Sequence, residues 1–238
     1  MSDKKTKRLK PLPTKSANAH FLGVACLVLG NTSRPLLRLS YSCITTMKLH
    51  DCITDDFKTW IAKQHVFFVG TAPLSGEGHV NLSPKGYDAL RIIDDHTICY
   101  MDMGGSGNET SAHVTENGRI TFMFCAFEGG PRILRLYGRG QVLLPDHPEW
   151  NRYFSKYNDK LPGTRQIIVN HVVRVQTSCG YGVPFMKYQE DRDTLSSFFA
   201  KKGEKGSEDY MKEGTARTSI DGLPTPQGEK FNKDEGKN

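Results

Sequence analysis

The sequence lacks both the spacing patterns of a metal-binding scaffold and the long apolar run of a membrane anchor. Its six cysteines include no C-x-x-C pair, and they combine with no histidines at zinc-finger spacing. The apolar run Phe21–Leu29 has nine residues, whereas a membrane helix needs about 20. We therefore expect no metal site and no membrane contact. Cysteines used in this way are typical of a reducing compartment.

The body of the chain also lacks a surplus of positive charge. The first 46 residues carry eight Lys or Arg residues against one acid, Asp3, which gives them a net charge of +7. The whole chain carries +6, so residues 47–238 sum to −1. Since a domain that binds nucleic acid needs a basic surface, we expect no nucleic-acid partner.

Residues 1–46 form a basic extension, which we expect to be disordered or to serve as a targeting leader. Its basic, Ser/Thr-containing and acid-poor composition is typical of a transit peptide. Alternatively, Met47 begins the natural chain, and the extension results from a start assigned too far upstream. The expected location is cytoplasmic, or organellar if residues 1–46 are a transit peptide.

Hydrophobic patterning predicts an all-β domain with a few short helices. Six segments have the apolar content or the alternation of strands, namely 66–69, 79–83, 97–101, 119–126, 132–144 and 166–175. No β-α units alternate, so the pattern favours a closed antiparallel barrel over a doubly wound sheet. Alternation in His79–Ser83 predicts a strand with one face in the core. Gly138 and Gly140 predict a bend or bulge within their strand.

Short helices are expected at 55–64 and 148–154, where apolar residues recur at helical spacing. A third helix is expected after the strand at 97–101. There, Ser106 and Glu109 match the capping box that opens a helix, and Gly118 supplies the left-handed residue that ends it.

The C-terminal part is expected to be a tail rather than a further domain. Helical segments at 193–200 and 208–212 are broken by Gly203 and Gly206, and an ordered turn follows at 219–224. Beyond it the composition is polar and typical of disorder. The predicted division is a leader at 1–46, a barrel domain at 47–190, a helical tail packing on the barrel at 191–224 and a disordered tail at 225–238.

Two polar segments carry groups of the kind that hold a phosphate dianion. Asn81–Gly86 supplies a hydroxyl, a cation and a glycine at a strand end, and Gly104–Ser111 supplies backbone N–H groups and hydroxyls at a helix start. Each segment alone is equally typical of a solvated lysine or a helix cap. Their order along the chain (strand, Ser-x-Lys, strand, Gly-rich turn, helix) favours phosphate binding.

A set of motifs resembles the pyridoxamine 5′-phosphate oxidase-like family of FMN-binding split barrels. The motifs are Gln64-x-x-Phe-Phe68, Asn81-Leu-Ser-Pro-Lys-Gly86, Gly107-Asn-Glu-Thr-x-x-His113, Asn117-Gly-Arg119, Phe124-Cys-Ala-Phe-Glu128, Pro131-Arg-Ile-Leu-Arg-x-Tyr-Gly138, Cys179-Gly-Tyr-Gly-Val-Pro184 and Ser219-Ile-Asp-Gly-Leu-Pro224. The set is specific, although no single motif is. The likeness covers about Met47 to Pro224.

The resemblance implies a six-stranded antiparallel split β-barrel of the FMN-binding type, usually a homodimer with flavin at the subunit interface. It implies an oxidoreductase that acts on a small-molecule substrate. The residues that it places on FMN are Asn81, Ser83, Lys85, Gly86, Asn108, Thr110, Ser111 and Arg132. Residues three apart on a strand face opposite sides, so at most one of Arg132 and Arg135 reaches the ligand. Phe122, Phe124 and Phe127 exceed the needs of one small core, which favours a dimer.

One departure limits what the resemblance implies about activity. The oxidase itself ends in an Arg/Trp-containing segment that holds pyridoxal phosphate, and this sequence has no such segment. Oxidation of pyridoxamine phosphate is therefore not implied. The alternatives are a non-catalytic flavin-, deazaflavin- or haem-binding module, and an interaction barrel with an empty site.

No residue is named as a catalytic acid or base. His113 is a candidate haem ligand, although a histidine on a helix surface or at an interface is the simpler interpretation. Cys99 and Cys125 lie in apolar strand-like runs, so we expect both to be buried thiols. No histidine lies beside Cys125 in the sequence, so it is not expected to act as a nucleophile.

Overall fold

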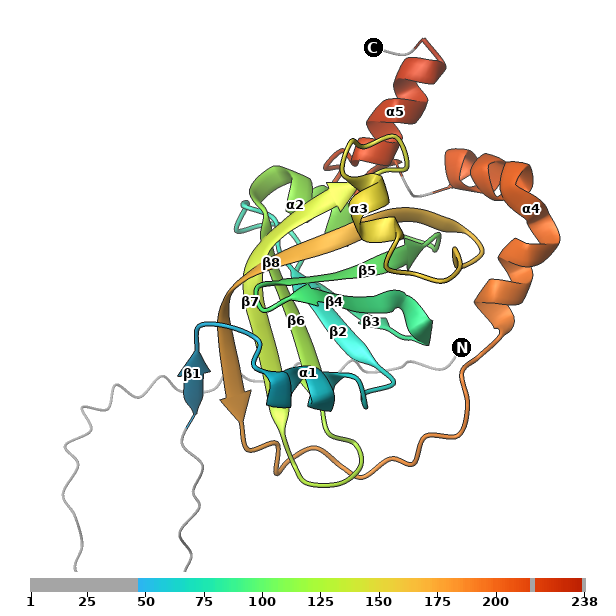
Figure 1. Ribbon diagram of the computed structural model, residues 1–238. Coiled ribbons are helices and arrows are strands. Elements are labelled where there is room, and N and C mark those ends of the chain that lie inside the picture. Colours follow the sequence, from blue (N-terminus) through green and yellow to red (C-terminus); the bar gives the residue numbers. More distant parts are fainter. Residues whose placement is uncertain (1–46, 215–216, 237–238) are drawn as a thin grey trace, which may run out of the picture. The chain divides into compact units, whose positions relative to one another are not determined.

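The structure is a computed structural model that describes residues 47–214 and 217–236. The expectations about the extension at 1–46 fall outside these residues. Within them, eight strands form one antiparallel sheet (Figure 1). The strands are β1 Lys48–His50, β2 Phe67–Thr71, β3 Asn81–Lys85, β4 Leu90–Asp94, β5 Thr97–Met103, β6 Arg119–Cys125, β7 Ile133–Leu143 and β8 Thr164–Ser178.

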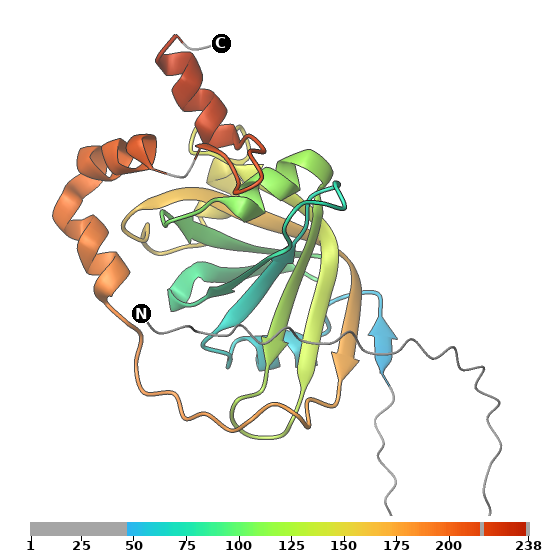
Figure 2. The same ribbon diagram turned by 180° about the vertical axis from the view of Figure 1, so that it is seen from behind.

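The sheet has the strand order β3-β2-β6-β7-β8-β5-β4, and β1 also pairs with β8. It curls on itself into a split barrel, as Figure 1 and the reverse view in Figure 2 show. The predicted all-β fold is confirmed. The prediction of six strands is wrong, because the sequence patterns did not reveal β1 and β4. β1 has only three residues, and β4 has four part-buried residues in a row, so neither shows a clear alternation.

The longest strand, β8, organises the sheet. One of its edges pairs with β7, and its other edge pairs first with β5 and then with β1. The irregularity predicted at Gly138 is confirmed, because the register between β7 and β8 shifts between Tyr137 and Gly138. The extra residue, however, is Val173 of β8, so the bulged strand is β8 rather than β7. A side chain at Gly138 would not fit there, since its Cβ would lie 1.9 Å from Oδ1 of Asn170.

Aromatic side chains fill the barrel. The ring centroids of Phe67, Tyr100 and Phe122 lie 5.6–5.7 Å apart, and the Phe124 ring stacks on Phe67 at 5.7 Å. Such ring pairs each contribute about 0.5–1.5 kcal/mol beyond their buried area. Phe122 and Phe124 are fully buried in this core. The suggestion that they exceed the needs of one core is therefore wrong.

Five α-helices accompany the sheet in the described part of the chain. They are α1 Asp55–Ile61, α2 Glu109–Asn117, α3 Trp150–Phe154, α4 Thr194–Glu213 and α5 Pro226–Asp234, and a 3-10 turn, η1, spans Tyr87–Ala89. The helices α1, α2 and α3 lie where the sequence predicts helices. As predicted, α2 ends at Gly118, whose φ is 71°.

The predicted capping box at the start of α2 is wrong. The N-cap residue is Asn108, not Ser106. The carboxylate of Glu109 accepts hydrogen bonds from the backbone N–H of Ile220, at 3.0 and 3.1 Å. Glu109 therefore ties the C-terminal turn at 219–224 to the start of α2 instead of closing the helix end on itself.

The tail differs from its prediction in two ways. α4 is one run broken only at Gly203, with φ 68° and ψ −177°, whereas breaks at both Gly203 and Gly206 were expected. The predicted disorder beyond residue 225 is wrong for α5. Thr225 caps this helix by accepting a hydrogen bond from Gly228 N–H at 3.0 Å. The buried ring of Phe231 anchors the helix to the rest of the protein. One helix cap and one buried aromatic ring are therefore enough to order a segment of polar composition.

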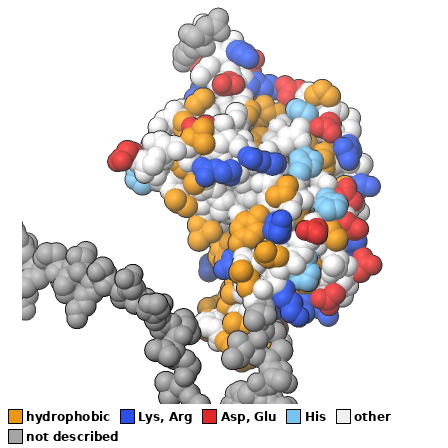
Figure 3. Space-filling view, turned by 90° about the vertical axis from the view of Figure 1, so that its left-hand side faces the viewer, with side chains coloured by type: hydrophobic (Ala, Val, Ile, Leu, Met, Phe, Trp, Pro, Cys, Tyr) orange, Lys and Arg blue, Asp and Glu red, His pale blue; other side chains and the backbone are white. Residues whose placement is uncertain are grey.

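Residues 179–193 contain no helix or strand. They leave the end of β8, pass beside the hairpin between β6 and β7, and reach α4 (Figures 1 and 2). We call this segment the strap. In the part of the chain that the structure describes, no helix is long and apolar enough to cross a membrane. On the face shown in Figure 3, basic, acidic and hydrophobic side chains are interspersed.

Candidate functional site

A cavity of about 430 Å³ opens where the end of β3, the end of β5 and the loop before α2 meet. We call it the basic cavity. Its walls include the side chains of Ser83, Lys85, Asp102, Thr110 and Arg165, together with the glycine-rich loop 104–107. The two segments that the sequence predicts to bind phosphate therefore border one space.

β3 turns its polar side chains inward. Asn81, Ser83 and Lys85 pair with β2 residues that are buried in the barrel, and directly paired residues share a face of the sheet. Val80 and Leu82 are instead 77% and 64% exposed. The sequence predicted only that one face of this strand lies in the core, because alternation alone does not say which face is inside. The polar residues lie inward because each finds a partner there.

Asp102, at the end of β5, is the centre of the basic cavity. Its side chain is 2% exposed and binds two cations, with Lys85 Nζ at 2.7 Å and Arg165 Nε at 2.9 Å. Gln166 Nε2 donates a third hydrogen bond at 2.8 Å. Burial by itself raises the pKa of Asp102, but the charges of Arg165 and Lys85 outweigh burial and hold this pKa well below its usual range.

Gln166 links this ion cluster to the start of α2. Its Nε2 also donates to Oδ1 of Asn108 at 2.8 Å, and its Oε1 accepts from the hydroxyl of Ser111 at 3.1 Å. Ser111 is fully buried. The helix start is thus held against β8 by side chains that point away from solvent.

A second row of hydrogen bonds joins β3 to α2. Asn81 Nδ2 donates to the hydroxyls of Thr71 and Thr110, both at 3.0 Å. The hydroxyl of Ser83 donates to Oδ1 of Asn81 at 2.8 Å. Thr71 in turn contacts Nδ1 of His113 at 3.0 Å. Asn81 therefore positions the hydroxyl groups of the site rather than lining it.

Arg165 is the least satisfied group of the cavity. Arg165 is 5% exposed, and its Nη2 donates a hydrogen bond to the carbonyl of Gly107 at 2.8 Å. Its Nη1 is buried without a hydrogen-bond partner among the residues that the structure describes. Leaving a buried donor unpaired costs about 1–3 kcal/mol, and more when the group is charged. An anion in the cavity is the kind of group that would satisfy it.

Sequence matches to known proteins show the family of this chain. The family described as pyridoxamine 5′-phosphate oxidase matches residues 53–179. A curated relative, the pyridoxamine 5′-phosphate oxidase family protein ustO of Aspergillus flavus, is 34% identical over 193 residues, which cover 74% of this chain and 76% of that protein. The chain belongs to the pyridoxamine 5′-phosphate oxidase family. The family suggested by the sequence motifs is therefore confirmed.

Solved structures of more distant proteins align with about half of this chain. HupZ of Group A Streptococcus is 22% identical and covers 52% of this chain and 91% of its own, with a TM-score of 0.41. An FMN-binding protein of Syntrophomonas wolfei is 18% identical and covers 49% of this chain and 79% of its own, with a TM-score of 0.37. At these scores the likeness adds nothing to what the family match and the sheet topology show.

In this member of the family, most of the predicted cofactor-binding residues gather at one place. Those that line the basic cavity are Ser83, Lys85, Gly86, Asn108 and Thr110. Asn81 and Ser111 lie behind these residues as supports. Arg132 lies elsewhere, with Nη1 2.9 Å from Asp56 and its guanidinium 5.6 Å from the Trp60 ring. Arg132 precedes β7 and lines a different cleft.

Sequence reasoning missed Asp102 and Arg165. Each carries a signal that was available, namely a charged residue within or next to an apolar strand. Asp102 interrupts the run Thr97–Met103, and Arg165 comes two residues before the buried run Ile167–Val169. Charged residues are almost never fully buried unless they are paired. A buried Asp102 therefore predicts a cationic partner, and a buried Arg165 predicts an acidic one.

The remaining candidates are enclosed. His113 is fully buried, so its expected place on a helix surface or at an interface is wrong. Burial lowers its pKa, and its Nε2 is shut off from solvent. Cys99 and Cys125 are buried free thiols, as predicted. Burial raises the pKa of Cys99 to about 11 and also raises that of Cys125, so neither resembles an activated nucleophile.

Proposed function

We propose that this protein is an FMN-dependent oxidoreductase that binds the FMN phosphate in the basic cavity. Family membership supports a flavin, and the cavity supplies groups of the kind that a phosphate needs. A bound flavin would supply the redox chemistry, while the protein would contribute position and access. The substrate would be a small molecule, and no residue is assigned as an acid or base.

The donors of the cavity fit an anion. Its lining holds two cations, Lys85 and Arg165, which share the carboxylate of Asp102. The second acid of the lining, Glu109, accepts hydrogen bonds from the backbone N–H of Ile220. The cavity also faces the start of α2, and helix N-termini favour negative charge because their backbone N–H groups lack partners in the helix. A phosphate would meet a cation, hydroxyl groups and N–H groups at once.

The observation that carries this proposal is the buried Nη1 of Arg165. Without a ligand, this charged donor has no partner in the described chain. The bonds from Arg165 to Asp102 and to the Gly107 carbonyl hold the guanidinium in place beside the cavity. A rigid cation with a donor to spare favours a doubly charged group such as a phosphate.

We also propose a homodimer. β3 lies at one edge of the sheet, and its outward face carries the exposed Leu82 beside the exposed Val80. Exposed apolar residues on an edge strand are a liability that a second copy would remove. Light scattering of the flavin-loaded protein should give the mass of a dimer, and a monomer mass would contradict this.

Flavin titrations test the phosphate assignment. Lys85→Ala removes a charge-assisted contact of roughly 1.5–3 kcal/mol, so FMN affinity should fall about ten- to a hundredfold. Riboflavin, which lacks the phosphate, should bind weakly and should not respond to the substitution. Thr110→Ala should weaken FMN in the same way but less, because it removes a neutral hydrogen bond. Lys233→Ala, on α5, is the matched control and should change nothing.

Three outcomes would correct the proposal in different places. If riboflavin and FMN lose affinity equally, Lys85 reaches the flavin ring rather than the phosphate. If neither binds the unsubstituted protein, the cofactor is wrong. If FMN binds but NADH and NADPH reduce it no faster than they reduce free FMN, the protein is a flavin-binding module rather than an oxidoreductase.

A further inference from the structure

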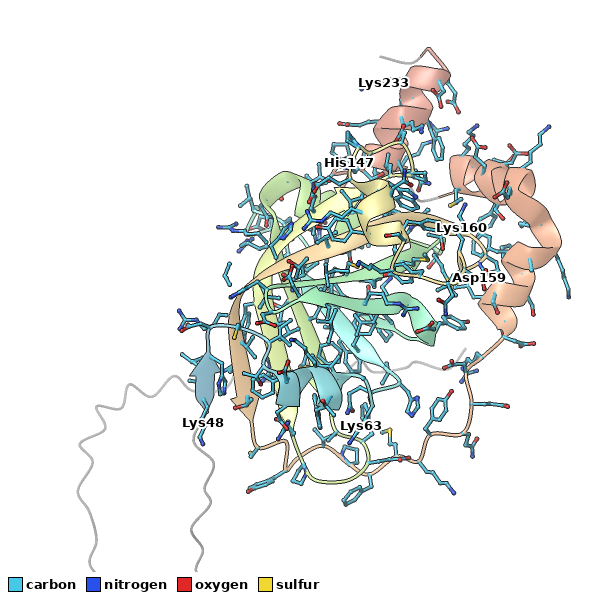
Figure 4. All side chains as sticks on the ribbon, viewed as in Figure 1. Lys48, Lys63, His147, Asp159, Lys160 and Lys233 are labelled. Carbon is cyan, nitrogen blue, oxygen red and sulfur yellow. The ribbon has the colours of Figure 1, made fainter. Side chains whose placement is uncertain are left out.

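A larger cleft lies between the end of α1 and the start of β2. It has a volume of about 670 Å³, within the range of small-molecule sites. Three segments enclose it, namely the stretch Trp60–Val66 at the end of α1, the β6–β7 hairpin at Phe127–Arg132 and the strap at Met186–Tyr188. We call it the aromatic cleft. Figure 4 shows Lys63, one of its lining residues, at the lower end of the barrel.

The strap is fixed against the hairpin, so the cleft has defined walls. Met186 N–H donates to the carbonyl of Phe127 at 3.0 Å, and Tyr188 N–H donates to the carboxylate of Glu128 at 2.8 Å. The rings of Tyr188 and His65 stack with centroids 3.6 Å apart and planes only 7° from parallel. An extended segment has few contacts of its own, and these three contacts hold it.

The walls favour a flat ligand. Trp60, His65, Phe127 and Tyr188 all line the cleft. Aromatic rings pair best with other flat rings in offset or edge-on contact. A stacked pair already exists at the wall, so a planar molecule would extend an arrangement that is present rather than require a new one.

The rim favours a negative charge. Lys63, Lys187 and Arg132 line the cleft against one acid, Glu128, and a second acid, Asp56, is bound to Arg132. Within residues 47–214 and 217–236, Lys63 and Lys187 have no ion-pair partner. The cations therefore outnumber the acids, and two of them have no acid of their own.

We propose that the aromatic cleft is a second binding site, which takes a planar aromatic molecule that carries a negative charge. The site does not depend on the flavin proposal, since it shares no lining residue with the basic cavity. The two are neighbours, however. His65 lines the cleft and Gly86 lines the cavity. A Cβ atom added to Gly86 would lie 3.5 Å from the carbonyl oxygen of His65.

Calorimetric titration of the full chain tests this inference, with 2-naphthoate as the probe. Neutral 2-naphthol tests the need for charge, and cyclohexanecarboxylate tests the need for a flat ring. We expect 2-naphthoate to bind more tightly than either. The double substitution Lys63→Gln with Lys187→Gln should weaken 2-naphthoate about fivefold and leave 2-naphthol unchanged, as expected for two exposed charges.

A second variant checks the walls. Tyr188→Ala should weaken both naphthalene compounds about fivefold, because it removes one stacking surface. Lys233→Gln is the matched control and should leave 2-naphthoate binding unchanged, since Figure 4 places Lys233 at the opposite end of the described chain. FMN affinity should be the same in all these variants, so a failure of the flavin proposal would leave this test intact.

Several results would overturn the inference. The first is 2-naphthoate binding no tighter than its two controls, or indifferent to the double lysine substitution and to Tyr188→Ala. Displacement of 2-naphthoate by FMN would assign the cleft to the flavin. Loss of 2-naphthoate binding as the protein self-associates would show that a second copy covers the cleft.

Discussion

The basic cavity and the aromatic cleft hold their charged groups in opposite ways. In the cavity, one buried carboxylate binds two cations, and each partner fixes the position of the next. In the cleft, Lys63 and Lys187 are exposed above aromatic walls, and only the strap's few contacts hold one side in place. The cavity is part of the core, whereas the cleft lies between the core and a surface segment.

Because of this difference, we expect substitutions in the two sites to change the stability of the protein by different amounts. Removing one member of a buried ion cluster leaves a charge without water or a partner. Removing an exposed charge leaves its neighbours in solvent and changes stability little. Substitutions in the cavity should therefore report on folding as well as binding, while substitutions of the two exposed lysines in the cleft should report on binding alone.

The largest effect is expected for Asp102→Asn. It leaves Arg165 and Lys85 without their carboxylate, so the free energy of unfolding should fall by about 3–5 kcal/mol. The control is Asp88→Asn, which removes the partner of Arg91 from an ion pair whose Asp88 side chain is 80% exposed. This control should cost less than about 1 kcal/mol. Equal losses in urea unfolding at pH 7 would show that the cavity does not depend on its buried charge.

Acid should act on the same carboxylate. The pKa of Asp102 is depressed in the folded protein. Its contribution to stability is therefore present above the unfolded pKa of about 3.9 and is lost as the pH falls through the folded value. The urea midpoint of the unsubstituted protein should drop more steeply below pH 4 than that of Asp102→Asn. Parallel curves would mean that another carboxylate controls acid unfolding.

A substitution in the cleft should reduce stability less than the substitution of Asp102 in the cavity. Tyr188→Ala removes a ring that is 38% exposed and stacks on His65. The loss of stability should be no more than about 1.5 kcal/mol, the upper value for an aromatic pair. Thermal unfolding gives the comparison directly. A loss as large as that of Asp102→Asn would place the strap within the core.

The smallest effect is expected at an exposed pair that lies in neither site. His79 Nδ1 lies 2.6 Å from Asp221, and hydrogen bonding to Asp221 raises the pKa of His79 above 6.5. A raised pKa adds stability below the unfolded value, and this stability is lost as the pH rises through the folded value. His79→Gln should therefore flatten a slight decline in melting temperature above pH 6.5. A decline that persists in His79→Gln would assign it to another group.

The sequence predicted the barrel well where apolar strands are long. β6, β7 and β8 have enough residues to show their pattern, and Gly138 marked the irregular point between β7 and β8. β4 failed because its residues are part-buried on both faces, and α5 failed because one cap outweighed a polar composition. Such outcomes depend on partners that are distant in the chain, which local patterns do not contain.

The sequence identified only some of the side chains that meet in the basic cavity. Ser83, Lys85 and Thr110 belong to short motifs, so their meeting follows from the order of the elements. Asp102 and Arg165 belong to no motif, and their pairing across β5 and β8 depends on strand register. Arg132 belongs to a family motif but precedes its strand, and it lies away from this cavity. Motifs locate residues along the chain, whereas register and strand limits decide what they touch.

The position of β8 has a consequence for synthesis on the ribosome. Lys48 of β1 pairs with Thr177, and β5 and β7 pair with the same late strand. These three strands therefore keep unpaired edges until the last strand has left the exit tunnel. Contacts between residues so far apart in the chain form slowly, and open strand edges pair with other chains. The nascent protein should be most prone to aggregate just before residues 164–178 emerge, which makes this the stage at which a chaperone would be of most use.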